Sequence, residues 1–269
     1  METKDIIKLI EISTGLKYKY NQDTFKGGDV LEPTVRFAES VYVVDYKRFY
    51  PHLILMFNLY NGKLNELLKS LLHNSIHLEG EAKLSSKLVL NKIYGLMKHF
   101  DLKETEKVTL IGRQIIQQTR ELLSKEYKIL SSDTDSVTIQ CNDIEKLQGE
   151  LDYISKKFNS YAKNYQPTFK LEIENHFKYI YFFPNKTGFK KKQYLGVRQN
   201  GEIILKSKRL NFDEQLAFGF IAQELRKGNY QVNIDEFIKF TEKVLKENNK
   251  FINLENITIL ELNKPLVMI

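Results

Sequence analysis

Residues 41–44 form an unbroken apolar run, Val-Tyr-Val-Val, that ends in an acid, Asp45. A strand with one exposed face alternates polar and apolar residues, so a continuous β-branched and aromatic run is typical of a strand buried at the centre of a sheet. Farther along, two short β-like runs flank Asp133 and Asp135, which predicts a hairpin with exposed acids at its tip. The chain is therefore expected to fold around a sheet that presents carboxylates at the ends of neighbouring elements.

Helical and extended patterns alternate along the rest of the chain. Helices are expected after Pro51 and at residues 3–14, 63–72, 81–97, 108–122, about 145–164, 213–227 and 234–248. A loop is expected at 25–33, and strands at 127–130, 136–140, 169–183, just after the basic run 190–194, and 257–262. The segments 63–72 and 81–97 are joined by polar residues, as an antiparallel helical hairpin requires.

The composition is that of a folded, basic protein. With 269 residues, of which 42% are hydrophobic and 28% charged, the chain is long enough for a sizeable core. Lys and Arg exceed Asp and Glu by seven and the pI is near 9.1, which suggests a polyanionic partner such as nucleic acid. Lysine-rich proteins from AT-rich genomes are basic without such a partner, so charge alone leaves both interpretations open.

Cysteine usage and hydropathy favour an intracellular protein. Cys141 is the single cysteine, which excludes an intramolecular disulfide and a cysteine-rich zinc site. The N-terminal residues carry charges throughout, and no apolar run approaches the ~18 residues of a membrane span. We therefore expect a cytoplasmic protein, or one in a host's cytoplasm if it comes from a virus or mobile element, without a membrane partner.

The three acids form a candidate metal site. Asp133 and Asp135 lie two residues apart, so in an extended segment they face the same side and can share a site with Asp45 if the strands are neighbours. Like charges so placed repel unless cations neutralise them, and hard carboxylate oxygens suit Mg²⁺. On spacing alone, a polar turn and a helix N-cap remain an alternative interpretation.

Three motifs in fixed order resemble those of family B DNA polymerases. The first is Asp45 followed five residues later by Tyr50-Pro51, the second is Lys87 with Asn91 and Tyr94-Gly95, and the third is Ser132-Asp133-Thr134-Asp135-Ser136. Supporting matches are Gly27-Gly28 with Glu32-Pro33, Leu171-Glu172-Ile173-Glu174, and Lys191-Lys192-Gln193-Tyr194-Leu195-Gly196. Each pattern is short, but together they cover most of the chain.

The resemblance implies an α+β right-hand polymerase. Its expected parts are an antiparallel-sheet palm, short two-helix fingers and a small, mostly helical thumb. The corresponding ranges are palm at 1–58 and 99–200, fingers at 59–98 and thumb at 201–269. The implied reaction is template-directed transfer of dNTPs to a primer 3′-hydroxyl with two Mg²⁺ ions, with Mn²⁺ tolerated.

The resemblance also assigns roles to individual residues. Asp45 and Asp135 would be the main metal bridges, with Asp133 as an auxiliary ligand. The nucleotide-binding residues would be Arg48, Phe49, Tyr50, Lys87, Asn91 and Tyr94, with the Lys87 ammonium on the triphosphate and the Tyr50 ring as a steric gate against a 2′-hydroxyl. The DNA-binding residues would be Gly95, Lys191, Lys192 and Tyr194.

The sequence departs from the family pattern in places that change charge and size. Arg48 and His52 stand where the family usually has Ser, Lys92 replaces the Ser after Asn91, and Ser131-Ser132 replaces Tyr-Gly. Only 44 residues precede Asp45, which leaves no room for the family's N-terminal and 3′–5′ exonuclease domains, so we expect synthesis without proofreading. The 42 positions from Asp45 to Lys87 are too few for the insertion of protein-primed relatives, so we expect nucleic-acid priming.

Competing interpretations remain at this stage. A small thumb predicts low processivity unless a processivity factor assists, and a separate exonuclease chain is another candidate partner besides primer-template DNA and dNTPs. A catalytically idle DNA-binding subunit, one chain of a split polymerase, and another palm-type nucleotidyltransferase such as a reverse transcriptase are the alternatives. The intact acids and Lys87 argue against idleness, and Tyr-Pro with the Lys-Asn-Tyr-Gly element favours family B.

Overall fold

The computed structural model describes residues 2–162, 169–184, 188–207, 219–224, 227 and 257–261. Its helices are α1 (Thr3–Thr14), α2 (Phe49–Met56), α3 (Asn65–Ile76), α4 (Gly80–Leu96), α5 (Leu102–Leu123) and α6 (Ile144–Asn159), with 3-10 turns η1 (Leu59–Gly62) and η2 (Met97–His99). Its strands are β1 (Val30–Leu31), β2 (Phe37–Tyr46), β3 (Lys128–Asp133), β4 (Ser136–Gln140), β5 (Leu171–Pro184), β6 (Phe189–Arg198), β7 (Ile203–Ser207) and β8 (Ile257–Glu261).

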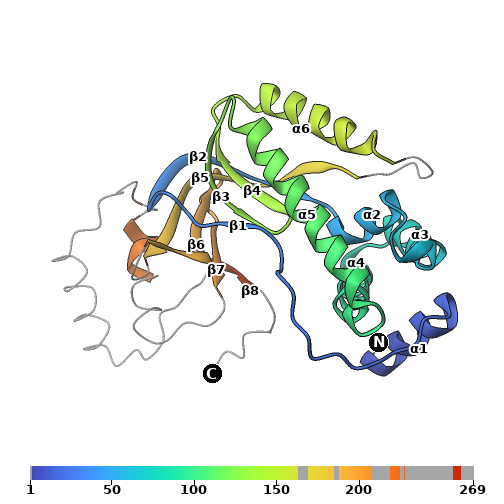
Figure 1. The fold of residues 1–269 in the computed structure, drawn as a ribbon. Helices are drawn as coiled ribbons and strands as arrows, with labels where there is room; N and C mark the ends of the chain where they lie inside the picture. Colours follow the sequence, from blue (N-terminus) through green and yellow to red (C-terminus); the bar gives the residue numbers. More distant parts are fainter. Residues whose placement is uncertain are drawn as a thin grey trace, which may run out of the picture.

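The described strands form one sheet in the order β1-β3-β4-β2-β5-β6-β7-β8. Every described pairing is antiparallel except β7 with β8, which is parallel. In Figure 1, α5 and α6 lie across the sheet and α1 to α4 form a helical group beside it. The fold class is therefore α+β, as predicted, with β2 at an interior position between β4 and β5.

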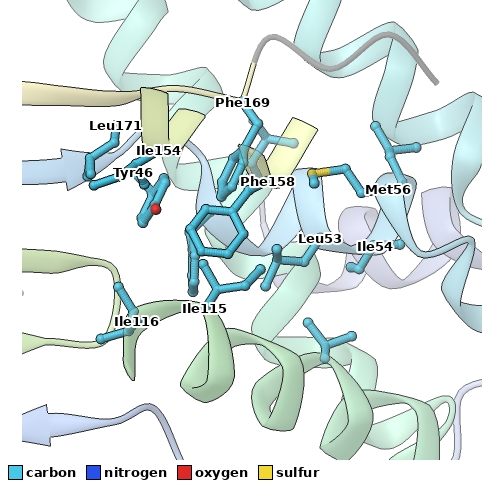
Figure 2. Packing of buried hydrophobic residues seen from close by; sticks show 14 of the residues in the cluster. Tyr46, Leu53, Ile54, Met56, Ile115, Ile116, Ile154, Phe158, Phe169 and Leu171 are labelled. Carbon is cyan, nitrogen blue, oxygen red and sulfur yellow. The ribbon is translucent and has the colours of Figure 1, made fainter. Parts of the chain in front are cut away.

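The principal core joins β2 and α2 to α5 and α6, which cover the sheet, and continues into α1, α3 and α4 (Figure 2). Tyr46, at 1% exposure, stacks on Phe169 with ring centroids 4.6 Å apart and meets the Phe158 ring edge-on. Its hydroxyl shares a 2.7 Å hydrogen bond with Thr119 of α5, so the one polar atom of this ring is satisfied. Because Tyr46 follows Asp45 directly, this packing fixes the end of β2.

Local sequence explains where several helices begin. The Asp101 side chain accepts the N–H of Glu104 (3.1 Å) at the start of α5, and the Asp143 side chain accepts the N–H of Lys146 (3.0 Å) at the start of α6. Each bond satisfies a donor that a helix otherwise leaves without an intrahelical partner. The predicted helical hairpin is present as α3 and α4, and these helices contact each other.

Some element boundaries differ from the sequence expectation. Pro51 lies inside α2 rather than before it, in the first turn, where its missing N–H costs no intrahelical bond. The basic run 190–194 is part of β6 rather than a lead into it. The predicted helices at 213–227 and 234–248 fall almost entirely outside the described residues, of which 219–224 are helical. Within the described ranges, no helix has the length and apolarity needed to cross a membrane.

Candidate active site

Strand pairing places the three predicted acids at one end of the sheet. Asp45, the penultimate residue of β2, is in register with Ser136 of β4. Asp133 ends β3 and lies opposite the same Ser136 across the hairpin. The N–H of Tyr46 donates to the backbone carbonyl of Asp135 (2.9 Å), which fastens the hairpin turn to the end of β2. The turn and the strand are therefore held as one unit by backbone hydrogen bonds.

The hairpin turn is not extended. Thr134 has φ 53°, in the left-handed region, so Asp133 belongs to the strand and Asp135 to the turn. The expectation that the two acids face one side because they lie in an extended segment is wrong. The Thr134 N–H donates to the carbonyl of Asp29 (2.8 Å), and its hydroxyl donates to the Asp133 carboxylate (3.1 Å), so the strained residue is held from both sides.

Burial and neighbouring carboxylates oppose the ionisation of Asp45 and Asp135. Burial raises the pKa of Asp45 to about 8, and the Asp135 and Glu174 carboxylates add to this rise. Burial raises the pKa of Asp135 to about 6, and the adjacent Asp133 carboxylate adds to it. All three acids are half-buried, so the prediction that the hairpin tip exposes Asp133 and Asp135 is wrong: the turn packs onto β2 instead of projecting into water. A cation between such carboxylates would offset both the cost of ionising a buried group and the repulsion between the charges.

Asp133 is neutralised by a lysine from β6. The Lys192 Nζ lies 3.0 Å from the Asp133 Oδ1, and the two side chains are 34% and 22% exposed. Across the described ranges, no three His, Cys, Asp or Glu side chains gather into a metal-binding cluster. The Asp45 and Asp135 carboxylates could hold a divalent cation, because hard carboxylate oxygens suit Mg²⁺.

Two tyrosines link the helices next to the acids. Tyr50 of α2 and Tyr94 of α4 stack with ring centroids 4.0 Å apart and an interplanar angle of 13°. Burial, followed by the Asp135 carboxylate, raises the pKa of Tyr50 to about 12, and burial raises the pKa of Tyr94. A Cβ at Gly112 of α5 would lie 3.3 Å from the Tyr50 ring, so this glycine lets α5 approach it closely. Because the pKa values of Tyr50 and Tyr94 are both raised, both hydroxyls stay protonated at neutral pH.

The predicted nucleotide-binding polar side chains differ in their surroundings: Lys87 and Asn91 face solvent, whereas Arg48 contacts the backbone of α3. Lys87 and Asn91 are exposed and lie one turn apart on α4. Lys87 is close enough to Asp45 to lower the pKa of that carboxyl, although burial outweighs this effect. Arg48 precedes α2 with φ 52°, and its Nη2 lies 3.5 Å from the carbonyl oxygen of Ser75 in α3.

Two residues with predicted ligand contacts are core residues in the structure. Phe49 is 2% exposed and packs against the rings of both Tyr46 and Phe169. Tyr194 is 6% exposed, and its ring lies edge-on to Phe177. Gly95 is exposed at the end of α4, and the side chain of Lys191 lies outside what the structure describes. A ligand contact by Phe49 or Tyr194 stays a prediction that this burial does not favour.

Arg120 is a site residue that the sequence interpretation missed. Its Nη2 lies 2.6 Å from the Asp29 carboxylate, and its Nη1 donates to the Ser132 hydroxyl (2.7 Å). That hydroxyl oxygen also accepts the N–H of Leu31 at 3.2 Å. Arg120 of α5 therefore joins the segment before β1 to the strand that carries Asp133. No local pattern could indicate this pairing, because the partners are about ninety residues apart along the chain.

The glycine pair upstream of β1 closes over the acidic turn. The Arg113 Nη1 donates to the carbonyls of Lys26 (2.6 Å) and Gly27 (2.9 Å). A Cβ at Gly28 would lie 2.8 Å from the Cγ2 and Oγ1 of Thr134, so only glycine fits this contact without movement. The sequence marks the Gly27-Gly28 pair, and the structure gives it a place against the turn between Asp133 and Asp135.

Comparison with known proteins identifies the class of the chain. The family model described as DNA polymerase family B matches residues 66–208, which is more than half of the sequence. The chain belongs to DNA polymerase family B.

Curated relatives and a solved structure agree with this family. DNA polymerase 1 of Sulfolobus acidocaldarius is 29% identical over 197 residues, covering 67% of this chain and 21% of the relative. DNA polymerase 1 of Aeropyrum pernix is 25% identical over 282 aligned positions, covering 85% of this chain and 27% of the relative. The family B DNA polymerase structure from the hyperthermophilic archaeon Pyrobaculum calidifontis shares the fold, with a TM-score of 0.61 at 15% identity over 91% of this chain and 38% of its own. The chain thus spans about a fifth to two fifths of the proteins it resembles.

Proposed function

We propose that this chain is a DNA-directed DNA polymerase that adds dNTPs to a primer 3′-hydroxyl. The observation that carries the proposal is the pair Asp45 and Asp135, two half-buried carboxylates at the end of the central strand whose pKa values are both raised by burial, with Asp135 adding to the rise at Asp45, in a chain that belongs to DNA polymerase family B. Carboxylates are seldom placed in this way without a cation to neutralise them.

Asp45 and Asp135, with Asp133, are proposed to hold the divalent cations. Two such ions, Mg²⁺ with Mn²⁺ tolerated, would supply activation of the attacking hydroxyl and neutralisation of the pyrophosphate leaving group. Asp133 starts from an ion pair with Lys192. A lysine that contacts DNA phosphates displaces condensed counterions, which favours binding. Contact of Lys192 with duplex phosphates would therefore free Asp133 to join the other two acids.

The incoming dNTP is proposed to lie between the acids and α4. Lys87 is exposed on α4 and electrostatically close to Asp45, so its ammonium can meet a triphosphate there. Arg48 adds a second cation at the start of α2. The Tyr50 ring, stiffened by its stack on Tyr94, would fill the space that a ribose 2′-hydroxyl needs. These contacts position the nucleotide and exclude the wrong sugar.

The hand-like division is proposed in the same terms. The sheet with α5 and α6 would be the palm (1–58 and 99–200), the α3–α4 hairpin the fingers (59–98), and residues 201–269 the thumb. The chain is proposed to work from a nucleic-acid primer, because the 42 positions from Asp45 to Lys87 are too few for the insertion of protein-primed relatives. Low processivity, and with it a processivity factor or separate exonuclease chain as partner, belongs to the same proposal.

A catalytically idle DNA-binding subunit is the second candidate, favoured by the Asp133–Lys192 ion pair, which occupies one of the acids. Extension of a labelled primer separates the two candidates. Template-dependent extension with dNTPs and Mg²⁺, absent with rNTPs and lost in Asp135→Ala, supports the polymerase. DNA binding without extension under any tested metal supports the idle subunit.

A further inference from the structure

A hollow lies between the segment that follows α1 and the junction of α4 with α5. Its lining includes Lys19, Tyr20, Asp23, Lys98, His99 and Phe100. Two backbone-anchored contacts join its walls: the Lys19 N–H donates to the His99 carbonyl (2.7 Å), and the Asn21 N–H donates to the His99 Nδ1 (2.9 Å). The walls are thus built by specific hydrogen bonds between segments about eighty residues apart.

An aromatic platform forms one wall of this hollow. The Tyr20 ring stacks on His99 with centroids 5.1 Å apart and an interplanar angle of 15°. Tyr18 meets His99 from another direction at 5.4 Å and lies edge-on to Phe100 at 5.6 Å. Tyr20 nonetheless remains 67% exposed. A large ring held flat by a neighbour while most of its surface faces water has a stacking surface to offer a ligand.

The charge beside the platform favours an anionic ligand. Lys19 is exposed and Lys98 half-buried, and both line the hollow together with one acid, Asp23. The chain as a whole carries a net charge of +7. Flat aromatic rings next to lysines are the combination that binds unpaired nucleic acid, because bases stack on the rings while lysines contact phosphates.

The hollow is connected to the acidic turn by a single stretch of chain. In Figure 1 the segment after α1 runs from the helical group to β1 at the sheet edge. Its first part is anchored where the Tyr18 N–H donates to Glu11 of α1 (3.0 Å). Its last part is held by Arg113 and Arg120 and lies against Thr134. One segment therefore supports both the aromatic platform and the turn that carries the acids.

We propose that the hollow formed by Tyr20, His99, Lys19 and Lys98 is a contact site for single-stranded nucleic acid, with Tyr20 as the base-stacking platform. The strand that it takes rests on the proposed function: it would be the unpaired template that has not yet reached the acids. The site is separate from the acids and the residues assigned to the nucleotide, so its contribution is to binding of the single strand rather than to chemistry.

Binding of a fluorescent dT12 oligonucleotide in EDTA without nucleotides tests the site. Tyr20→Ala is expected to weaken binding about tenfold, because stacking on an aromatic ring contributes substantially per base. Tyr20→Phe is expected to bind like the wild type, since it keeps the ring. Tyr153→Ala is the matched control, as Tyr153 is 56% exposed on α6 and lies outside the hollow. Lys19→Gln is expected to reduce the slope of log K against log salt by about 0.7.

Three results would overturn the inference. Equal losses in Tyr20→Ala and Tyr153→Ala, an undetectable affinity of the wild type for dT12, or competition by a blunt duplex as strong as by dT12 would each do so. Binding is measured in chelator, so it does not depend on the metal-dependent reaction. A protein that binds dT12 through Tyr20 but never extends a primer would therefore contradict the proposed function and support the single-strand site. A protein that extends primers while Tyr20→Ala binds dT12 normally would support the proposed function and contradict the single-strand site.

Discussion

Replacing Asp45 by Asn is expected to stabilise the metal-free protein while abolishing activity. The pKa of Asp45 is raised from 3.8 to about 8, chiefly by burial and then by Asp135. At 1.36 kcal/mol per pKa unit, the full shift sets an upper bound of about 6 kcal/mol on the cost of ionising this side chain in the folded state. Water reaches the half-buried carboxylate, so we expect a gain of about 1–3 kcal/mol, or roughly 2–5 °C in Tm, near pH 8.

The sign of the pH dependence follows from the raised pKa. An acid that binds its proton more tightly when folded gives stability that is fully present below the unfolded pKa and lost as pH rises through the folded pKa. The difference between Asp45→Asn and the wild type should therefore vanish near pH 4 and grow up to about pH 8. Thermal unfolding in EDTA at several pH values measures it, with Asp152→Asn, an exposed carboxylate of α6, as the control.

Divalent metal gives the second half of the same test. Mn²⁺ should raise the Tm of the wild type, because a ligand that binds only the folded state stabilises it, and should raise the Tm of Asp45→Asn less. An Asp45→Asn protein that is less stable than the wild type at pH 8, or a stability difference that does not change with pH, would refute the reasoning from burial and repulsion.

Three further predictions follow from individual contacts. Gly28→Ala should lower kcat for primer extension severalfold because its Cβ would displace the acidic turn, whereas Gly27→Ala, with open space at its Cβ, should not; equal rates would contradict this. Lys192→Ala should weaken duplex binding and reduce the salt slope by about 0.9, measured by anisotropy, and an unchanged slope would exclude a phosphate contact by the partner of Asp133. Tyr46→Phe should cost about 1 kcal/mol in denaturant unfolding by removing its hydrogen bond to Thr119, and no change would show that the bond contributes nothing.

Local patterns sufficed for the elements that carry the site. The apolar run before Asp45 and the β-like runs around Asp133 are short-range signals, and both appear as adjacent strands of the sheet. The predicted starts of α2 and β6 were less accurate. For α2 the reason is that Pro51 fits equally well before a helix or in its first turn. Period and propensity thus located elements better than they located boundaries.

The interior of the site depended on contacts that no local pattern encodes. The hydrogen bond from Thr134 to Asp29, the ion pair of Asp133 with Lys192 and the arginine contacts to residues 26–29 all join segments far apart in sequence. Motif matching assigned Phe49 to a ligand, yet its ring is buried in the core. A motif identifies which residues occur together, but it does not show how deeply each side chain is buried.

Single-nucleotide incorporation is the most direct test of template-directed DNA synthesis at the site of Asp45 and Asp135. A recessed primer is offered one dNTP at a time on four templates that differ only in the first unpaired base, with the wild type, Asp135→Ala and Asp152→Asn compared. We expect the wild type and Asp152→Asn to add the complementary dNTP on each template, and Asp135→Ala to add none. Incorporation that ignores the template base, or that persists in Asp135→Ala, would contradict the account.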